Sequence, residues 1–137
     1  MDSESLLGEL LDGKYEILRP LARGGMGAVY VARRLALGDL VAVKHLLPSR
    51  DSDSNRQRLL REARAAARIR HPSVVQIFDY GRLKSGGPYL VMEYLDGLTL
   101  EELLDRERRL PPSRALELLG EICAAVETSD WPAVCAR

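Results

Sequence analysis

The segment from residue 21 to residue 44 constrains the fold of this chain most strongly. It places three glycines, Gly24, Gly25 and Gly27, between two apolar stretches and sets Lys44 within a third. Glycine lets a backbone adopt positive φ and approach a ligand without a Cβ in the way. Backbone N–H groups in such a turn form an anion-binding concavity, and an ammonium group adds a point charge for phosphate. The segment therefore predicts two strands around a glycine turn, a lysine-bearing third strand and a phosphate ligand.

The two-residue period of a strand decides which way Lys44 points. In residues 28–35 the period places Val29 and Val31 on one face, and in residues 40–47 it places Lys44 on the same face as Ala42. Burying a lysine among apolar residues is costly unless it meets a carboxylate or a phosphate. The plain alternative is a solvated lysine on an edge strand. The neighbouring histidine, His45, is expected on the outside of the sheet.

Residues 56–70 read as a helix that supplies a carboxylate. Its apolar positions recur at helical spacing, and Glu62 falls within the apolar stripe. The stripe consists of Leu59, Ala63, Ala66 and Ile69. An acid on a buried face needs a partner, so we expect an ion pair between Glu62 and Lys44. Three arginines gather on the opposite side, which predicts a solvated face: Arg61, Arg64 and Arg68.

The remaining segments predict a small mixed fold. A short strand covers residues 15–21, His71 and Pro72 end the helix, and residues 74–80 and 88–94 form a hairpin. Thr99 is expected to cap a helix over 100–108, and a further helix follows Pro111. The predicted fold class is therefore α+β, with a five-stranded antiparallel sheet, one main helix and two later helices.

Composition excludes several classes of protein. The formal net charge of zero argues against a general attraction to nucleic acid or to anionic membranes. Two cysteines, Cys123 and Cys135, fit neither a disulfide framework nor a zinc pattern. The N-terminus is acidic, and no apolar run reaches membrane-spanning length. These features predict a cytoplasmic location, with no nucleic-acid partner and no membrane segment in this chain.

Residues 1–14 contain a misleading pattern. Gly8, Gly13 and Lys14 have the spacing of a phosphate-binding P-loop. Tyr15, however, follows the lysine where that motif needs a hydroxyl for magnesium, and no strand is expected before Gly8. We therefore predict a tail or a short helix that docks on the rest of the chain.

Taken in order, the motifs resemble the N-terminal lobe of a bacterial, eukaryotic-like serine/threonine protein kinase. The motifs are the glycine-rich segment 21–30, Val-Ala-Val-Lys at 41–44, Arg-Glu-Ala at 61–63, His-Pro at 71–72 and Val-Met-Glu-Tyr-Leu at 91–95. The resemblance divides the chain into a tail (1–14), an ATP-binding N-lobe (15–95), the hinge exit and first C-lobe helices (96–126) and a divergent tail (127–137).

The resemblance implies a nucleotide site. Lys44 would hold the α and β phosphates of ATP while paired to Glu62, and these two are the implied catalytic residues. Leu21, Val29 and Ala42 would wall the adenine pocket, with Met92 at its back. The backbone of Glu93 and Leu95 would form hydrogen bonds with the adenine edge. Ala22 departs from the family pattern, because it stands where the first glycine is usual. The implied nucleotide-binding residues are Leu21, Ala22, Arg23, Gly24, Gly25, Met26, Gly27, Val29, Ala42, Lys44, Met92, Glu93 and Leu95.

Two catalytic motifs of the family do not occur among the 137 residues. Neither His45 nor His71 is followed by Arg-Asp, and the single phenylalanine, Phe78, is not preceded by aspartate. The family needs the aspartates of the His-Arg-Asp and Asp-Phe-Gly motifs for substrate orientation and for Mg²⁺, so no metal ligands are expected in this chain.

The absence of the His-Arg-Asp and Asp-Phe-Gly motifs favours the hypothesis of a truncated or frame-shifted kinase gene product. Translation of the downstream DNA would test this hypothesis. The chain is expected to retain an ATP-binding cradle but no phosphotransfer to a protein substrate. The alternative is a non-catalytic regulatory or dimerisation module that docks on full-length kinases through their N-lobes.

Overall fold

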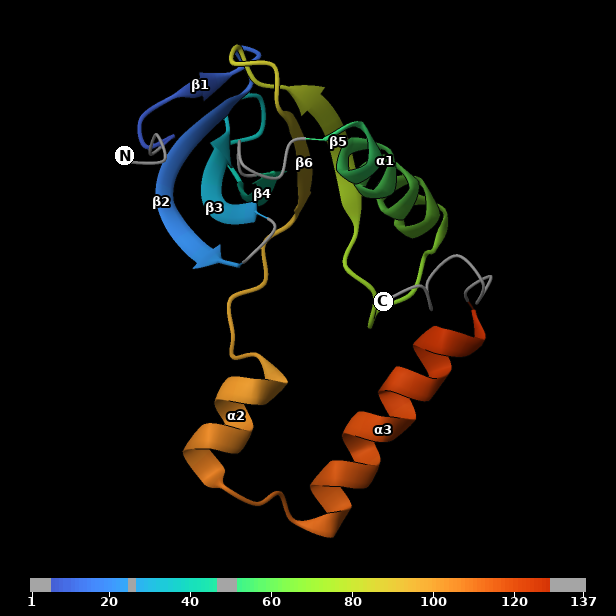
Figure 1. The fold of residues 1–137 in the computed structure, drawn as a ribbon. Coiled ribbons are helices and arrows are strands. Elements are labelled where there is room, and N and C mark those ends of the chain that lie inside the picture. The colour runs from blue at the N-terminus through green and yellow to red at the C-terminus, as the bar shows by residue number, and fades with distance from the viewer. Residues whose placement is uncertain (1–5, 25–26, 47–51, 129–137) are drawn as a thin grey trace.

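A curled antiparallel sheet, one helix against it and two further helices make up the fold. The computed structural model describes residues 6–24, 27–46 and 52–128 (Figure 1). In chain order the elements are β1 (Leu10–Leu11), β2 (Tyr15–Arg23), β3 (Gly27–Arg34), β4 (Leu40–Leu46), α1 (Asp53–Arg68), β5 (Ile77–Arg82), β6 (Pro88–Glu93), α2 (Leu100–Glu107) and α3 (Pro112–Glu127).

The described sheet has six strands in the order β1-β2-β3-β4-β6-β5, and all neighbours pair antiparallel. The α+β class is confirmed, but the prediction of five strands was one too few. The extra strand, β1, is only two residues long, so it carries no readable alternation. It forms because Leu6 and Leu11, each 5% exposed, add to the core inside the curl. The described part of the predicted tail is therefore integral to the sheet.

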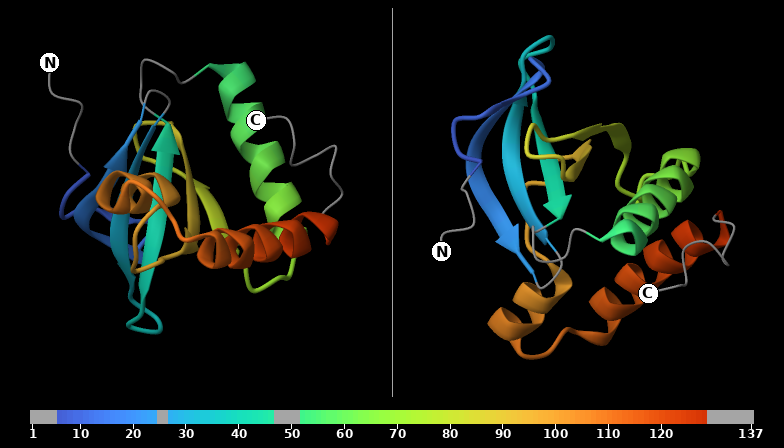
Figure 2. Two further views of the ribbon diagram at one scale, coloured as in Figure 1. Left: turned by 90° about the horizontal axis from the view of Figure 1, so that it is seen from below. Right: turned by 45° about the horizontal axis from the view of Figure 1, so that its top comes forward.

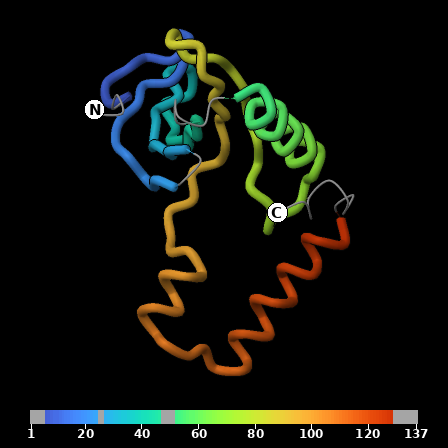
Figure 3. The backbone as a smooth tube through the Cα atoms, viewed as in Figure 1, coloured from blue at the N-terminus to red at the C-terminus, as the bar shows by residue number. Residues whose placement is uncertain are grey.

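The two faces of the sheet bury different sets of residues. The inner face of the curl holds one apolar cluster, drawn from the odd-numbered positions of β4 and the even-numbered positions of β3. On the outer face, Leu59 and Ala63 of α1 pack with Leu46 and Leu90. Figures 2 and 3 show α1 beside the sheet, while α2 and α3 extend away from it. The predicted alternation of β3 and β4 is confirmed.

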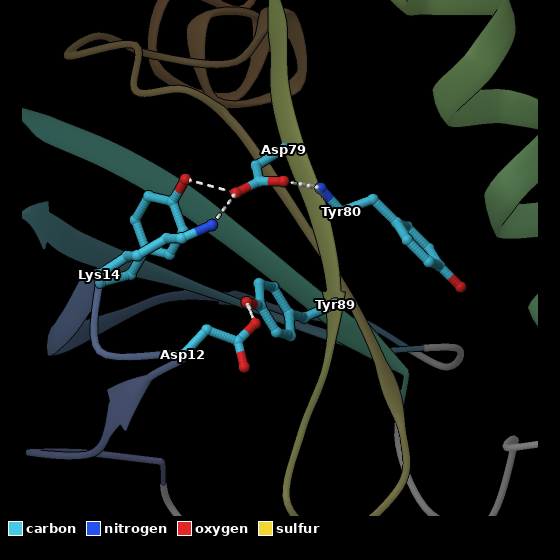
Figure 4. Close-up of polar contacts among 6 residues, drawn as sticks. Asp12, Lys14, Asp79, Tyr80 and Tyr89 are labelled. Carbon is cyan, nitrogen blue, oxygen red and sulfur yellow. Dashed lines mark hydrogen bonds and ion pairs between the residues drawn. The ribbon is translucent and has the colours of Figure 1, made fainter.

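Polar contacts join the two ends of the curled sheet (Figure 4). The Tyr15 hydroxyl on β2 donates to Oδ2 of Asp79 on β5 over 2.8 Å, and Nζ of Lys14 lies 3.6 Å from the same oxygen. The Tyr89 hydroxyl on β6 donates to Asp12, which adopts a positive φ of 48° in the turn after β1. The edges of the sheet, far apart in strand order, are thereby held together.

Burial and these carboxylates shift the tyrosine pKa values. Burial, together with the hydrogen bond to Asp79, raises the pKa of Tyr15 to about 12. Burial and the hydrogen bond to Asp12 likewise raise the pKa of Tyr89. Burial acts against ionisation of Asp79, but the hydrogen bonds from Tyr15 and from the Tyr80 N–H outweigh it and lower the pKa of the carboxyl. Both hydroxyls therefore remain protonated donors at neutral pH.

His45 lies inside the curl, so the prediction of an outward-facing ring was wrong. It is 6% exposed, its ring stacks on that of Tyr30 with centroids 5.6 Å apart, and Nδ1 lies 2.9 Å from the carbonyl oxygen of Leu46. The alternation that points Lys44 to the outer face points its neighbour inward.

Local signals account for the helix ends. The Ser52 side chain accepts from the Asn55 N–H at the start of α1, and Thr99 forms a capping box with Glu102 at the start of α2. Helix α3 begins at Pro112, as the sequence predicts. Its apolar side chains are largely uncovered, and Leu116 is 69% exposed. Among the described residues, no helix combines the length and apolar character that crossing a bilayer requires.

Candidate nucleotide-binding site

The strand register gathers the predicted site residues on one sheet face. Directly opposite residues of antiparallel strands share a face, and Ala22 pairs with Val29, which pairs with Lys44. In the next row, Ala42 pairs with Met92. Lys44 and Ala42 alternate on the same strand, so both rows lie on the same face. The sheet therefore presents a small apolar surface with one ammonium group at its side.

Lys44 stands half-buried on the face against which α1 packs. Its cross-strand neighbour Leu90 belongs to the cluster that holds α1 to the sheet. Across residues 6–24, 27–46 and 52–128, no carboxylate lies within ion-pair distance of Lys44. The ammonium is therefore available to an anionic ligand.

The predicted ion pair between Lys44 and Glu62 is not formed. Glu62 instead accepts from Nε of Arg58, one helical turn earlier, at 3.3 Å. The helix does turn the predicted side toward the sheet, since Leu59 and Ala63 are buried and the Glu62 side chain is only 22% exposed. Arg58 competes for the carboxylate because positions four residues apart lie on the same side of a helix. Arg58 is not among the arginines that the sequence predicts on the solvated face.

The glycine turn is described at its two ends. The N–H of Gly24 donates to the carbonyl of Gly27 over 2.9 Å, which closes the turn between β2 and β3. Gly24 has no positive φ, so the conformational freedom expected for it is not used. A Cβ at Gly27 would lie 2.2 Å from the carbonyl oxygen of His45, whereas at Gly24 it would meet no described residue within 4 Å. Gly27 thus serves strand packing and Gly24 leaves open space. Gly25 and Met26 lie outside the described residues.

The segment after β6 is fixed from one side and open on the other. The Glu93 N–H donates to the carbonyl of Gln76 over 2.9 Å, and the Glu93 carboxylate accepts from the Gln76 N–H. Leu95, two residues on, is 58% exposed, and no hydrogen bond within the described chain engages its backbone. That backbone is therefore available to a flat polar ligand edge. Gln76 had no predicted role, because nothing in the sequence pattern marks it.

Comparison with known proteins identifies this arrangement. The protein kinase domain family matches residues 15–129. The chain belongs to the protein kinase family. A probable serine/threonine-protein kinase of Streptomyces coelicolor is 45% identical over 123 residues, which are 87% of this chain and 18% of that protein. PknB of Mycobacterium tuberculosis (strain H37Rv) is 39% identical over 123 residues, 87% of this chain and 20% of PknB.

Solved kinase structures agree with the fold. The PknI kinase domain of Mycobacterium tuberculosis superimposes with a TM-score of 0.73 at 28% identity, over 90% of this chain and 51% of that domain. The resemblance to the N-lobe portion of bacterial serine/threonine kinases is confirmed. This kinase chain spans about a fifth of the length of the curated relatives given above and about half of the solved kinase domain.

The remaining predicted nucleotide contacts of the kinase chain lie along the end of β2. Leu21, Ala22 and Arg23 are all exposed, and the register of β2 against β3 shifts between Pro20 and Ala22. Ala22, where the family pattern has glycine, faces the same side as Val29. The assignment of these residues to nucleotide contact stays a prediction.

Protein kinases use magnesium in catalysis, and aspartate side chains hold it. Within the described residues, no three His, Cys, Asp or Glu side chains come together as a metal site. The carboxylate closest to a role in the site, Glu62, is already bonded to Arg58. The described residues therefore do not fit a magnesium centre of their own.

Proposed function

We propose that this kinase chain binds ATP on the sheet face that carries Ala42 and Lys44. In a kinase domain that also supplies the His-Arg-Asp and Asp-Phe-Gly motifs, the bound ATP would phosphorylate serine or threonine in a protein. The observation that carries the proposal is the register, which aligns Ala22, Val29 and Lys44 in one row and Ala42 with Met92 in the next.

Charge supports the phosphate end of the site. Lys44 is half-buried and without an ion-pair partner in the described chain, and an anion would offset the cost of that partial burial. Ammonium groups bind phosphate as point charges. The open space at Gly24 leaves room for phosphate beside the turn. Lys44 would therefore hold the triphosphate.

Apolar contact and backbone polarity support the adenine end. Val29 and Met92 offer partly exposed apolar side chains on either side of the buried Ala42, and Leu95 offers a backbone without a partner in the described chain. Ligand sites commonly combine an apolar lining with a few fixed polar groups. The bonds between Glu93 and Gln76 would hold this polar edge in place. Adenine would therefore lie between the sheet face and the segment after β6.

We expect nucleotide binding without phosphotransfer from the 137 residues alone. Phosphoryl transfer depends almost entirely on positioning and on electrostatic stabilisation, and both aspartate motifs are missing from the printed sequence. A radiolabelled-phosphate assay with the purified chain should show no transfer to protein. Turnover in that assay would contradict this expectation.

A titration series tests the binding proposal. The wild-type chain, Lys44→Met and the control Lys84→Met would be titrated with ATP and with adenosine. Lys84 is an exposed lysine between β5 and β6, away from the site. We expect Lys44→Met to weaken ATP binding about tenfold or more and to leave adenosine binding unchanged, while Lys84→Met changes neither. Failure of the wild type to bind ATP, or equal ATP affinity in Lys44→Met, would refute the proposal.

A further inference from the structure

Arg19 on β2 contacts Tyr94, the first residue after β6. The Arg19 guanidinium donates to the Tyr94 hydroxyl over 2.8 Å, and its carbon lies 5.8 Å from the centroid of the Tyr94 ring. The two residues are 75 positions apart in the chain. This contact joins the strand that leads into the glycine turn to the segment that leads out of the sheet.

The register places Arg19 on the candidate nucleotide face. Arg19 pairs with Val31, Val31 pairs with Ala42, and Ala42 pairs with Met92. These four residues therefore form one row across the sheet, and Tyr94 follows Met92 by two residues. Val31 and Ala42 are 1% and 3% exposed, although neither belongs to the two core clusters. The contact from Arg19 to Tyr94 thus borders a covered part of this face.

The backbone of β2 bends where Arg19 lies. Its register against β3 shifts between Ile17 and Arg19 and again between Pro20 and Ala22. Such irregularities re-aim side chains and locally increase the twist of a strand. A bent strand without further support would leave the position of its end poorly defined. The bond to Tyr94 supplies that support from across the sheet.

Two exposed leucines flank the contact. Leu21, two residues after Arg19, is 43% exposed, and Leu95, directly after Tyr94, is 58% exposed. Together they would border a flat ring inserted between the glycine-turn strand and the segment after β6. A contact that fixes both before a ligand arrives reduces the ordering cost of binding.

We propose that Arg19 and Tyr94 are positioning residues that fix the spacing between Leu21 and Leu95 and so strengthen binding of the adenine part of the nucleotide. This inference rests on the proposed ATP-binding function. It assigns no contact between Arg19 and the phosphates, which belong to the Lys44 end of the face. The effect should therefore depend on the base and not on the triphosphate.

The test compares wild type, Arg19→Ala, Tyr94→Phe and the double variant by titration with ATP, adenosine and inorganic tripolyphosphate. We expect Arg19→Ala to weaken ATP and adenosine binding by the same factor, roughly threefold, and to leave tripolyphosphate binding unchanged. Tyr94→Phe, which removes only the hydroxyl, should have a smaller effect of the same kind. The double variant should bind no more weakly than Arg19→Ala, because both changes break one contact.

Arg33→Ala is the matched control. Like Arg19, Arg33 is an exposed arginine, and it lies on the neighbouring strand β3. Its guanidinium lies 3.4 Å from the carboxylate of Glu16. It lies outside the row that contains Arg19, so its removal should leave all three affinities unchanged. Thermal unfolding of each variant should match the wild type, which separates positioning from a general loss of stability.

The outcomes separate this inference from the function on which it rests. If the wild type binds no ATP, both fail. If the wild type binds ATP but Arg19→Ala binds ATP and adenosine equally well, only the positioning role fails. Equal weakening of tripolyphosphate binding, or additive effects in the double variant, would also overturn the positioning role.

Discussion

Glu62 accepts a hydrogen bond from Arg58 over 3.3 Å and is not paired with Lys44 in the described part of the chain. Both partners lie on α1, four residues apart. Exposed or partly exposed pairs at this spacing contribute only about 0.3–0.5 kcal/mol. Arg58 therefore holds the carboxylate only weakly, and we expect Glu62 to exchange Arg58 for Lys44 when a nucleotide binds.

A first prediction concerns Arg58→Ala. Removal of the competing guanidinium should raise ATP affinity about twofold, which is the factor equivalent to about 0.4 kcal/mol. Glu62→Gln should lower ATP affinity, because it removes the carboxylate that we expect to join Lys44 in the nucleotide-bound chain. Calorimetric titration would measure both, with Arg61→Ala on the solvated face of α1 as the control. Unchanged affinity in Glu62→Gln would remove Glu62 from the site.

A second prediction separates two glycines of the turn. In Gly27→Ala the new Cβ would lie 2.2 Å from the backbone oxygen of His45, so strands β3 and β4 must move apart. We expect a loss of about 2–3 kcal/mol in the free energy of unfolding, measured in urea. Gly24→Ala meets open space at a φ that other residues tolerate, and should unfold like the wild type. Similar losses in both variants would contradict this steric explanation.

A third prediction concerns closure of the sheet by Tyr15 and Asp79. Tyr15→Phe removes a buried hydroxyl that donates over 2.8 Å to a carboxylate, and should cost about 1–2 kcal/mol and lower Tm by several degrees. Tyr30→Phe is the matched control, because the structure gives the Tyr30 hydroxyl no hydrogen bond within the described residues. The idea fails if the two variants have the same Tm.

A fourth prediction concerns stability in acid. Burial lowers the pKa of His45 and outweighs the hydrogen bond to the Leu46 carbonyl, which acts in the opposite direction. The folded chain therefore binds fewer protons than the unfolded chain, in which histidine titrates near pH 6.5. Stability from the neutral ring is present above that pH and is lost as pH falls below it.

Thermal melts at pH 7.5 and 5.0 would measure this loss. The wild type should lose more stability between these two pH values than His45→Val. Valine is chosen because Val41 and Val43, the neighbours of His45 on the inner face of β4, are also valines. His71→Ala, which changes the partly exposed histidine of the turn after α1, should behave like the wild type. An equal pH dependence in His45→Val and the wild type would show that His45 does not carry it.

Local patterns determined most of the secondary structure. Strand alternation, the caps at Ser52 and Thr99 and the proline at the start of α3 each act over a few residues, so the sequence could be read directly. The same alternation placed Ala42 and Lys44 on one face, which the pairing of β3, β4 and β6 bears out. The order of the motifs was enough to predict the kinase family.

Only the tertiary structure decided the contacts between distant segments. Three features depend on how far the sheet curls, and no local period in the sequence encodes that curvature. They are the burial of Leu6 and Leu11, the hydrogen bond from Tyr15 to Asp79 and the hydrogen bond from Arg19 to Tyr94. Whether Glu62 pairs with Arg58 or with Lys44 likewise depends on a difference in interaction free energy of less than about 1 kcal/mol. Short-range backbone preferences fix the elements, whereas small differences in side-chain energy fix which partners meet.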